Sequence, residues 1–328
     1  MIRVLPILVG LLACIAGPLR AECGTTGLDL AGPDVAAIDA RVAETPYGVG
    51  LLWEARRGDD RLTIVGTLHI GDDRHRPMID RLTPVIAEAD LLMVEITRAD
   101  EAVMLERIVT EPGLMYITDG PTLPELLTEE DWQRVTEAAA RRQIPGFLAA
   151  KLRPWALMVT LAIPPCAAAN LTEGAGLDHW LMAVADAYGT RQESLEPPDT
   201  LMRLFDAAGQ EAELDLLRAS LVSDDLLQRM HVSTLESYFA GQTARIMLLN
   251  EFAAIEVEAL TEEEEAEALA MMTSMLLDRR NLAWLPVIEA AAERHDDIVV
   301  AAGAGHLPGE LGILNLLEQS GWSIRRLN

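Results

Sequence analysis

The chain has 328 residues, half of them hydrophobic, which is enough to bury a large core in one domain or in two closely joined lobes. Its formal net charge is −26, with 52 acidic residues against 26 basic ones. Because so acidic a surface repels phosphate backbones and anionic lipids, we expect neither nucleic-acid binding nor attachment to a membrane surface.

The first 21 residues (1–21) have the pattern of an export signal. Met1-Ile2-Arg3 gives a short basic start, the apolar run 4–16 follows, and Ala21 offers a small residue at a cleavage point. The run is too short for a membrane span, and no other stretch of 20 uncharged residues exists. We therefore expect a periplasmic or secreted protein with no membrane insertion after signal removal.

The cysteines agree with export. Cys14 lies inside the expected signal, which leaves Cys23 and Cys166 as a pair in the mature chain. In an oxidising compartment such a pair favours a disulfide, which would tie the mature amino terminus to the middle of the protein. A lipoprotein site at Cys14 is the alternative, although only a short, mostly apolar segment would precede its cleavage point.

Apolar β-type runs bounded by turn residues predict six strands. They fall at 50–55, 62–65, 90–95, 191–196, 298–302 and 321–327. The turn cluster at 57–60 predicts that the first two form a hairpin.

Helical spacing predicts helices between these strands and in a long middle section. The expected helical segments lie near 33–42, 78–89, 171–187, 199–293 and 309–319, with further helices between 96 and 180. This pattern predicts a single α/β domain over 22–328, with a central mixed sheet and a large helical lobe packed over or inserted into it.

Two of the predicted strands end in the same Gly-x-x-His pattern. Gly66-Thr67-Leu68-His69 follows 62–65, and Gly303-Ala304-Gly305-His306 follows 298–302. In an open α/β sheet, ligands bind outside the carboxyl ends of the strands. The two histidines therefore predict one site assembled from both ends of the chain.

Four side chains at strand ends could bind a metal: His69, Glu95, Glu196 and His306. Histidine and carboxylate together suit a divalent zinc, manganese, iron or cobalt ion. Such an ion would lower the pKa of a bound water molecule and polarise a carbonyl group. One of the two glutamates could instead stay unligated and act as a general base, and the sequence does not decide which.

Other residues have simpler interpretations. A glutamate at a strand end often caps the next helix, and the Met271, Met272 and Met275 cluster is typical of a packed helix face. His75 is expected at the surface. The remaining histidines are expected to be structural: His179, His231 and His295. Ser194 beside Glu196 leaves a serine-hydrolase alternative, although no Gly-x-Ser-x-Gly, His-Glu-x-x-His or phosphate-binding loop is present.

Seven short motifs, taken in order, resemble the TraB/GumN family, which includes TIKI-type metalloproteases and pheromone-shutdown proteins. The resemblance spans roughly 23–328. The chain is also distantly similar to erythromycin esterases and ChaN-type haem-binding lipoproteins. The motifs are Gly66-Thr67-Leu68-His69, Val94-Glu95, Lys151-Leu152-Arg153-Pro154-Trp155, Gly176-Leu177-Asp178, Ser194-Leu195-Glu196, Arg280-Asn281 and Gly303-Ala304-Gly305-His306-Leu307.

The resemblance implies that Arg280 and Asn281 join the two histidines and two glutamates in one pocket. Arg280 would stabilise an oxyanion or hold a substrate carboxylate, unless the neighbouring Arg279 takes that role. By the same resemblance the protein would be a metal-dependent hydrolase, peptidase- or esterase-like, acting on a peptide or small-molecule substrate. The alternative is a non-catalytic protein that binds haem, a metal or a peptide.

Overall fold

The computed structural model of the chain describes residues 23–30, 32–167, 176–254 and 261–327. The expected export signal, Cys14 and the first part of the expected helix 171–187 lie outside these residues. Within them, no helix combines the length and apolar character that a membrane crossing requires.

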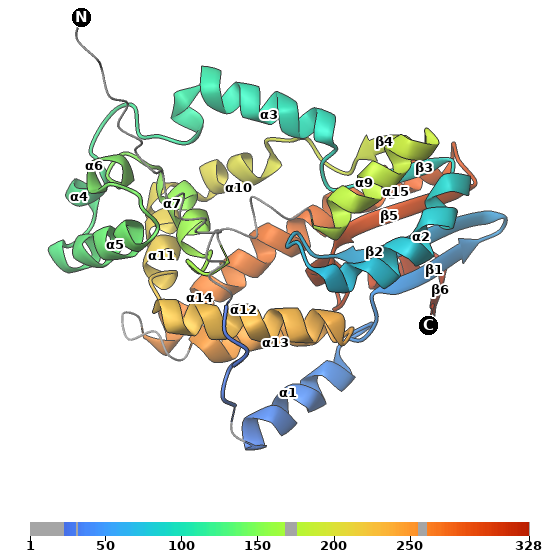
Figure 1. The fold of residues 1–328 in the computed structure, drawn as a ribbon, viewed down its shortest axis with the longest axis horizontal. Helices are drawn as coiled ribbons and strands as arrows, with labels where there is room; N and C mark the ends of the chain where they lie inside the picture. The colour runs from blue at the N-terminus through green and yellow to red at the C-terminus, as the bar shows by residue number, and fades with distance from the viewer. Residues whose placement is uncertain (1–22, 31, 168–175, 255–260, 328) are drawn as a thin grey trace, which may run out of the picture.

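One mixed sheet of six strands lies at one end of the molecule (Figure 1). Its order is β4-β3-β5-β2-β1-β6, with β2, β5, β3 and β4 parallel and β1 antiparallel to both β2 and β6. The strands are β1 Leu52–Arg57, β2 Asp60–Thr67, β3 Leu91–Val94, β4 Arg191–Ser194, β5 Asp297–Gly303 and β6 Ser323–Arg326. All six predicted strands and the predicted hairpin are confirmed.

The register aligns the carboxyl ends of the four parallel strands. Thr67 lies opposite Gly303, and Val94 lies opposite both Ala301 and Ser194. Residues that follow these strands therefore emerge at one edge of the sheet, where a site can form.

Helices cover both faces of the sheet. Alternate strand residues point to opposite sides, so the strands present apolar side chains on both faces. One face packs against α15 (Arg279–Ala292) and α16 (Ile313–Gln319), and the other against α2 (Arg76–Glu88) and α9 (Leu177–Tyr188). Ile64 and Val300 point to the first face, whereas Val65 and Val299 point to the second.

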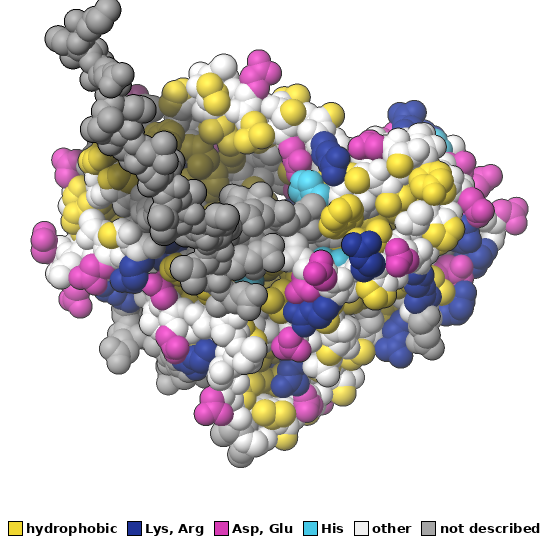
Figure 2. Space-filling model, viewed as in Figure 1, with side chains coloured by type: hydrophobic (Ala, Val, Ile, Leu, Met, Phe, Trp, Pro, Cys, Tyr) yellow, Lys and Arg dark blue, Asp and Glu magenta, His cyan; other side chains and the backbone are white. Residues whose placement is uncertain are grey.

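The helical lobe predicted from the sequence lies beside the sheet (Figure 1). Its core includes Trp155 and Phe205, whose rings stack at 5.7 Å. Hydrophobic side chains also gather along α3 at its surface, where Val103, Leu105 and Val109 are exposed (Figure 2). The helices of this region are α3 Arg98–Thr110, α4 Leu123–Leu126, α5 Glu129–Arg141, α6 Gly146–Ala149, α7 Pro154–Leu161, α10 Thr200–Ala208, α11 Gln210–Ala219, α12 Asp224–Phe239, α13 Thr243–Ala254 and α14 Glu262–Thr273.

The Lys-Leu-Arg-Pro-Trp motif has a structural role in this lobe. Arg153 pairs with the buried Glu213 at 2.6 Å, and the other oxygen of that carboxylate accepts the backbone N–H of Trp155 at 3.4 Å. Pro154 begins α7 with a backbone angle that suits a helix start. The motif therefore fixes the start of α7 against α11.

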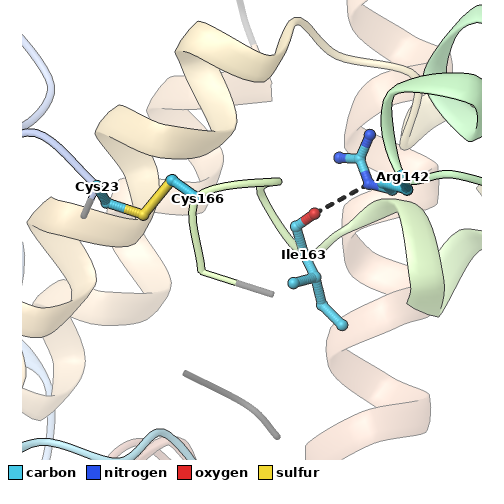
Figure 3. Close-up of a disulfide and its surroundings, with 4 residues drawn as sticks. All are labelled: Cys23, Arg142, Ile163 and Cys166. Carbon is cyan, nitrogen blue, oxygen red and sulfur yellow. Dashed lines mark hydrogen bonds between the residues drawn. A yellow bond between two sulfur atoms is a disulfide. The ribbon is translucent and has the colours of Figure 1, made fainter. Parts of the chain in front are cut away.

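Cys23 and Cys166 form the predicted disulfide (Figure 3). The segment before Cys166 is held from its other side by Arg142, which donates to the carbonyl oxygens of Leu161 at 2.7 Å and Ile163 at 3.0 Å. The amino-terminal segment is thus joined covalently to a loop of the helical lobe.

Two predictions about single side chains were wrong. His75 was expected at the surface, but it is buried, with Nε2 2.9 Å from the carbonyl oxygen of Ile70 and its ring against Tyr238 and Phe239. The charged residues beside it in the sequence favoured a surface position, whereas its contacts with α12, far along the chain, bury it. Met271 was expected on a packed face, but it is exposed while its neighbours Met272 and Met275 pack inward.

Candidate functional site

The six side chains selected from the sequence lie close together at the carboxyl edge of the sheet. Each comes from the end of an element. His69, Glu95 and Glu196 follow β2, β3 and β4, and His306 ends the short 3₁₀ helix η4 (Ala304–His306) after β5. Arg280 and Asn281 lie in the first turn of α15.

Arg280 lies at the centre of this cluster. Its Nε donates to Glu196 at 3.0 Å, and its Nη2 donates to Glu95 at 2.6 Å and to Glu196 at 2.7 Å. Its Nη1 donates to the carbonyl oxygen of Leu276 at 3.0 Å and faces Nε2 of His306 at 3.2 Å. A guanidinium group has five N–H donors, so every one of them is used within the protein. In this arrangement Arg280 positions its neighbours and has no donor left for a substrate oxyanion.

A π-helical turn, η3 (Ser274–Asp278), precedes Arg280. Such turns change the direction in which side chains leave a helix and are frequent at functional sites. Here the turn leads into Arg280, with the carbonyl of Leu276 directed at its guanidinium group. The neighbouring Arg279 is exposed, so Arg280 is the arginine that enters the cluster.

His306 is held as a neutral imidazole with a defined tautomer. Nδ2 of Asn281 donates to the carbonyl oxygens of His306 and Leu311, so Oδ1 of Asn281 is the acceptor for Nδ1 of the ring, at 2.6 Å. The lone pair therefore lies on Nε2, facing Arg280. Burial and the charge of Arg280 lower the pKa of His306 to about 4. Asn281 thus orients His306 and makes no contact toward solvent.

Glu95 is an ionised carboxylate in this cluster. Burial alone would raise its pKa, but the neighbouring histidines and Arg280, together with the N–H of Gly303 at 2.7 Å, lower it to about 2. A Cβ atom at Gly303 would come within 3.1 Å of Oε1 of Glu95. The glycine that begins the second Gly-x-x-His motif therefore leaves room for this carboxylate.

His69 is the accessible member of the cluster. Its side chain is 58% exposed, compared with 12% for Arg280 and 14% for Glu95. Nδ1 lies 3.3 Å from Oδ2 of Asp178, and Nε2 lies 3.7 Å from Oε1 of Glu95. Desolvation of the covered part of the ring would lower its pKa, but these two carboxylates raise the pKa of His69 to about 9.

Asp178 is a site residue that the sequence analysis did not select. In the sequence it stands out only as part of the Gly176-Leu177-Asp178 motif. A Cβ at Gly176 would lie 2.6 Å from Cα of His69, and the N–H of Leu177 donates to the carbonyl of Leu68 at 3.0 Å. The glycine thus lets the start of α9 approach the His69 loop. In the sequence, a glycine followed two residues later by an acid at a helix start gave only a weak signal for it.

The geometry can be compared with a metal site. Both oxygens of Glu196 accept hydrogen bonds, from Arg280 and from Nε1 of Trp284 at 2.8 Å, while Nε2 of His306 faces the same guanidinium group. A fixed positive charge among the expected ligands repels a second cation. Among the described residues, no group of three or more His, Cys, Asp and Glu side chains is arranged to hold a metal ion. As arranged, the expected ligands do not fit a metal.

Ser194 is occupied in a different way. Its hydroxyl group accepts from the N–H of Thr97 at 2.9 Å and donates to Asp100, so it fastens the start of α3. Its bonded partners include no histidine that could activate it as a nucleophile. The geometry therefore gives the serine-hydrolase alternative no support.

Comparison with known proteins identifies the family of the chain. The chain is 23% identical over 284 residues to an uncharacterized protein of Treponema pallidum (strain Nichols), which covers 82% of this chain and 80% of that relative. The model of the TraB/PrgY/gumN family matches residues 51–326, a range that contains all six selected side chains and Asp178. The chain therefore belongs to the TraB/PrgY/gumN family.

Proposed function

We propose that this protein hydrolyses an ester or amide bond by acid–base catalysis at His69. One observation carries the proposal: the accessible imidazole of His69 lies between the carboxylates of Asp178 and Glu95, above a buried and fully hydrogen-bonded cluster. Titratable groups with perturbed pKa values at the edge of a sheet are typical of catalytic sites.

The protonation states of His69 and Glu95 indicate which group acts as the acid and which as the base. At neutral pH, a pKa of about 9 makes His69 an imidazolium ion, and a pKa of about 2 makes Glu95 a carboxylate. Nε2 of His69 and Oε1 of Glu95 lie 3.7 Å apart, so one water molecule beside the pair can contact both groups. Glu95 accepts a proton as this water attacks the carbonyl carbon, and His69 donates its Nε2 proton to the leaving alcohol or amine. The proton on Glu95 then passes to His69, which restores both groups.

The remaining residues act through these two. Arg280 and the N–H of Gly303 hold Glu95, while Asp178 orients His69 and maintains its charge. A carboxylate with a pKa near 2 is a weak base. We therefore expect faster turnover of esters with good leaving groups than of unactivated amides.

Export to the periplasm or release from the cell is part of the same proposal. The Cys23–Cys166 disulfide supports it, because such bonds persist in oxidising compartments. The divalent metal expected from the sequence is not part of this proposal, and no step of this mechanism depends on it.

Nitrophenyl esters and nitroanilides test the reaction. We expect hydrolysis by the parent protein and a loss of kcat of about 10²–10⁴-fold in both His69→Ala and Glu95→Gln. His295→Ala is the matched control, because His295 is outside the cluster, and it should keep the parent rate. Turnover that persists in His69→Ala would contradict the proposal. A folded parent without turnover of any ester or amide would favour the binding-protein alternative.

A further inference from the structure

A large apolar cavity, partly open to solvent, lies in the helical lobe. Its volume is about 610 Å³, and its walls come from α7, α10, α11, α12, α13, α14 and η3. Small-molecule sites typically measure about 300–1,000 Å³ and are mainly apolar. The volume is therefore in the range of a ligand site, whereas packing defects in protein cores are rarely larger than a water molecule.

The side chains around the cavity indicate the chemistry of its ligand. Among the described residues that line it, none is an Asp, Glu, Lys or Arg, so a charged ligand would have no partner. Four of the lining residues are methionines, whose flexible side chains adapt to apolar ligands of different shapes. They are Met158, Met230, Met247 and Met272. The cavity thus suits an uncharged apolar chain or ring system.

The size indicates how large that group is. An apolar cavity of about 150 Å³ accommodates one benzene ring. The cavity in this protein is about four times as large, so a single small ring would leave most of it empty. A long acyl chain or several fused rings would fill it. A few polar side chains, including His231 and Thr234, are available to orient such a ligand.

Two elements in the cavity wall also form hydrogen bonds with elements that carry the candidate site. Leu276 and Leu277 of η3 line the cavity, and the carbonyl of Leu276 accepts a hydrogen bond from Arg280. On α12, Thr234 lines the cavity, and Tyr238 one turn later donates its hydroxyl to the carbonyl of Gly66 at 3.0 Å. Gly66 begins the motif that carries His69. The cavity and the site therefore share their supporting elements.

We infer that the cavity binds the uncharged apolar portion of the ester or amide on which the protein acts. The substrate class would then be esters or amides of long acyl chains or of apolar ring systems. The assignment of this group to a substrate rests on the proposed function, whereas the binding of an apolar ligand does not.

Binding of N-phenyl-1-naphthylamine, an uncharged apolar fluorophore, tests the cavity without any reaction. Ala268 lines the cavity on α14, whereas Ala270 on the same helix is exposed and does not. We expect the parent and His69→Ala to bind the probe with similar affinity, and Ala270→Trp to match them. In Ala268→Trp the affinity for the probe should fall by about tenfold or more. Thr234→Phe fills the cavity from α12 and serves as a second variant if Ala268→Trp does not fold.

A series of nitrophenyl esters from acetyl to decanoyl tests the assignment to the substrate. We expect KM to fall as the acyl chain lengthens in the parent and in Ala270→Trp, but not in Ala268→Trp. Probe binding without turnover of any ester would support the cavity and contradict the proposed reaction. Turnover that depends neither on chain length nor on Ala268→Trp would support the reaction and overturn the inference. Equal probe binding by the two tryptophan variants would also overturn the inference.

Discussion

Arg280 donates from Nη1 to Nε2 of His306 over 3.2 Å, and this contact joins the helix α15 to the second Gly-x-x-His motif. The same guanidinium group binds Glu95 and Glu196, so one residue connects the ends of three parallel strands. Because all of its donors are used, Arg280 fixes the positions of its neighbours. The accessible chemistry is left to His69.

Replacement of Arg280 tests this organising role. Arg280→Ala would leave two buried carboxylates without their partner, and loss of one member of a buried ion pair typically costs about 3–5 kcal/mol. We expect the free energy of unfolding, measured with urea, to fall by that amount. Arg279→Ala is the control, since that neighbour is exposed, and should change stability by less than about 0.5 kcal/mol. Similar losses in both variants would contradict the role assigned to Arg280.

His69 should make stability and activity depend on pH on the alkaline side. Its folded pKa of about 9 lies above the ordinary value of 6.5, so its stabilising contribution is complete below pH 6.5 and is lost as the pH rises through 9. The proposed proton donor disappears over the same range. NMR titration of the imidazole should give a pKa near 9, and Asp178→Asn should lower it. An unshifted pKa in the parent would contradict the pairing of His69 with the two carboxylates.

His306 and Glu95 should limit stability on the acid side. The pKa of His306 is lowered to about 4, so the unfolded chain binds a proton there before the folded protein does, and stability falls as the pH drops from 6.5 to 4. The pKa of Glu95 is lowered to about 2, so its contribution is complete above pH 4.5 and is lost toward pH 2. Urea midpoints measured across pH should fall on this side. His306→Gln should reduce the decrease between pH 6.5 and 4, and an unchanged slope would contradict the assignment.

The sequence predicted the sheet and much of the cluster because both depend on local patterns. Apolar β-type runs such as 298–302 predict strands, and parallel strands bring residues such as His69 and His306 to one edge. The central position of Arg280 was harder to predict from the sequence, because its five hydrogen bonds depend on how α15 approaches the ends of three strands. An acid in the first helical turn, such as Asp178, is so common that its sequence context alone does not mark it as a site residue.

The cavity could not be predicted from the sequence for a related reason. Its lining comes from seven helical elements, and residues such as Met158 and Met272 follow the same spacing whether they face a filled core or a cavity. Helical periodicity identifies the inward face of each helix. It does not give the distance between helices, which depends on all the side chains that meet there.

The disulfide should stabilise the protein against unfolding. Cys23 and Cys166 are separated by 143 positions, and loss of a native disulfide typically costs about 2–5 kcal/mol. We expect Cys23→Ser combined with Cys166→Ser to lower the free energy of unfolding by that amount, and reduction of the parent protein to have the same effect. Reductant should leave the double variant unchanged. Two free thiols in the unreduced mature protein would show that the bond does not form.

Elemental analysis of the protein, purified without chelator, decides between the metal predicted from the sequence and the arrangement around Arg280. With the guanidinium group among the expected ligands, we expect metal well below one ion per chain and ester hydrolysis that is unchanged by chelators. Near-stoichiometric manganese, cobalt, zinc or iron, lost in both His69→Ala and His306→Ala, would contradict this expectation. Arg280 would then have to leave the cluster on metal binding, because its charge and the ion cannot share the same carboxylates without repulsion. Activity restored by that metal alone would replace the proposed acid–base mechanism with a metal-dependent one.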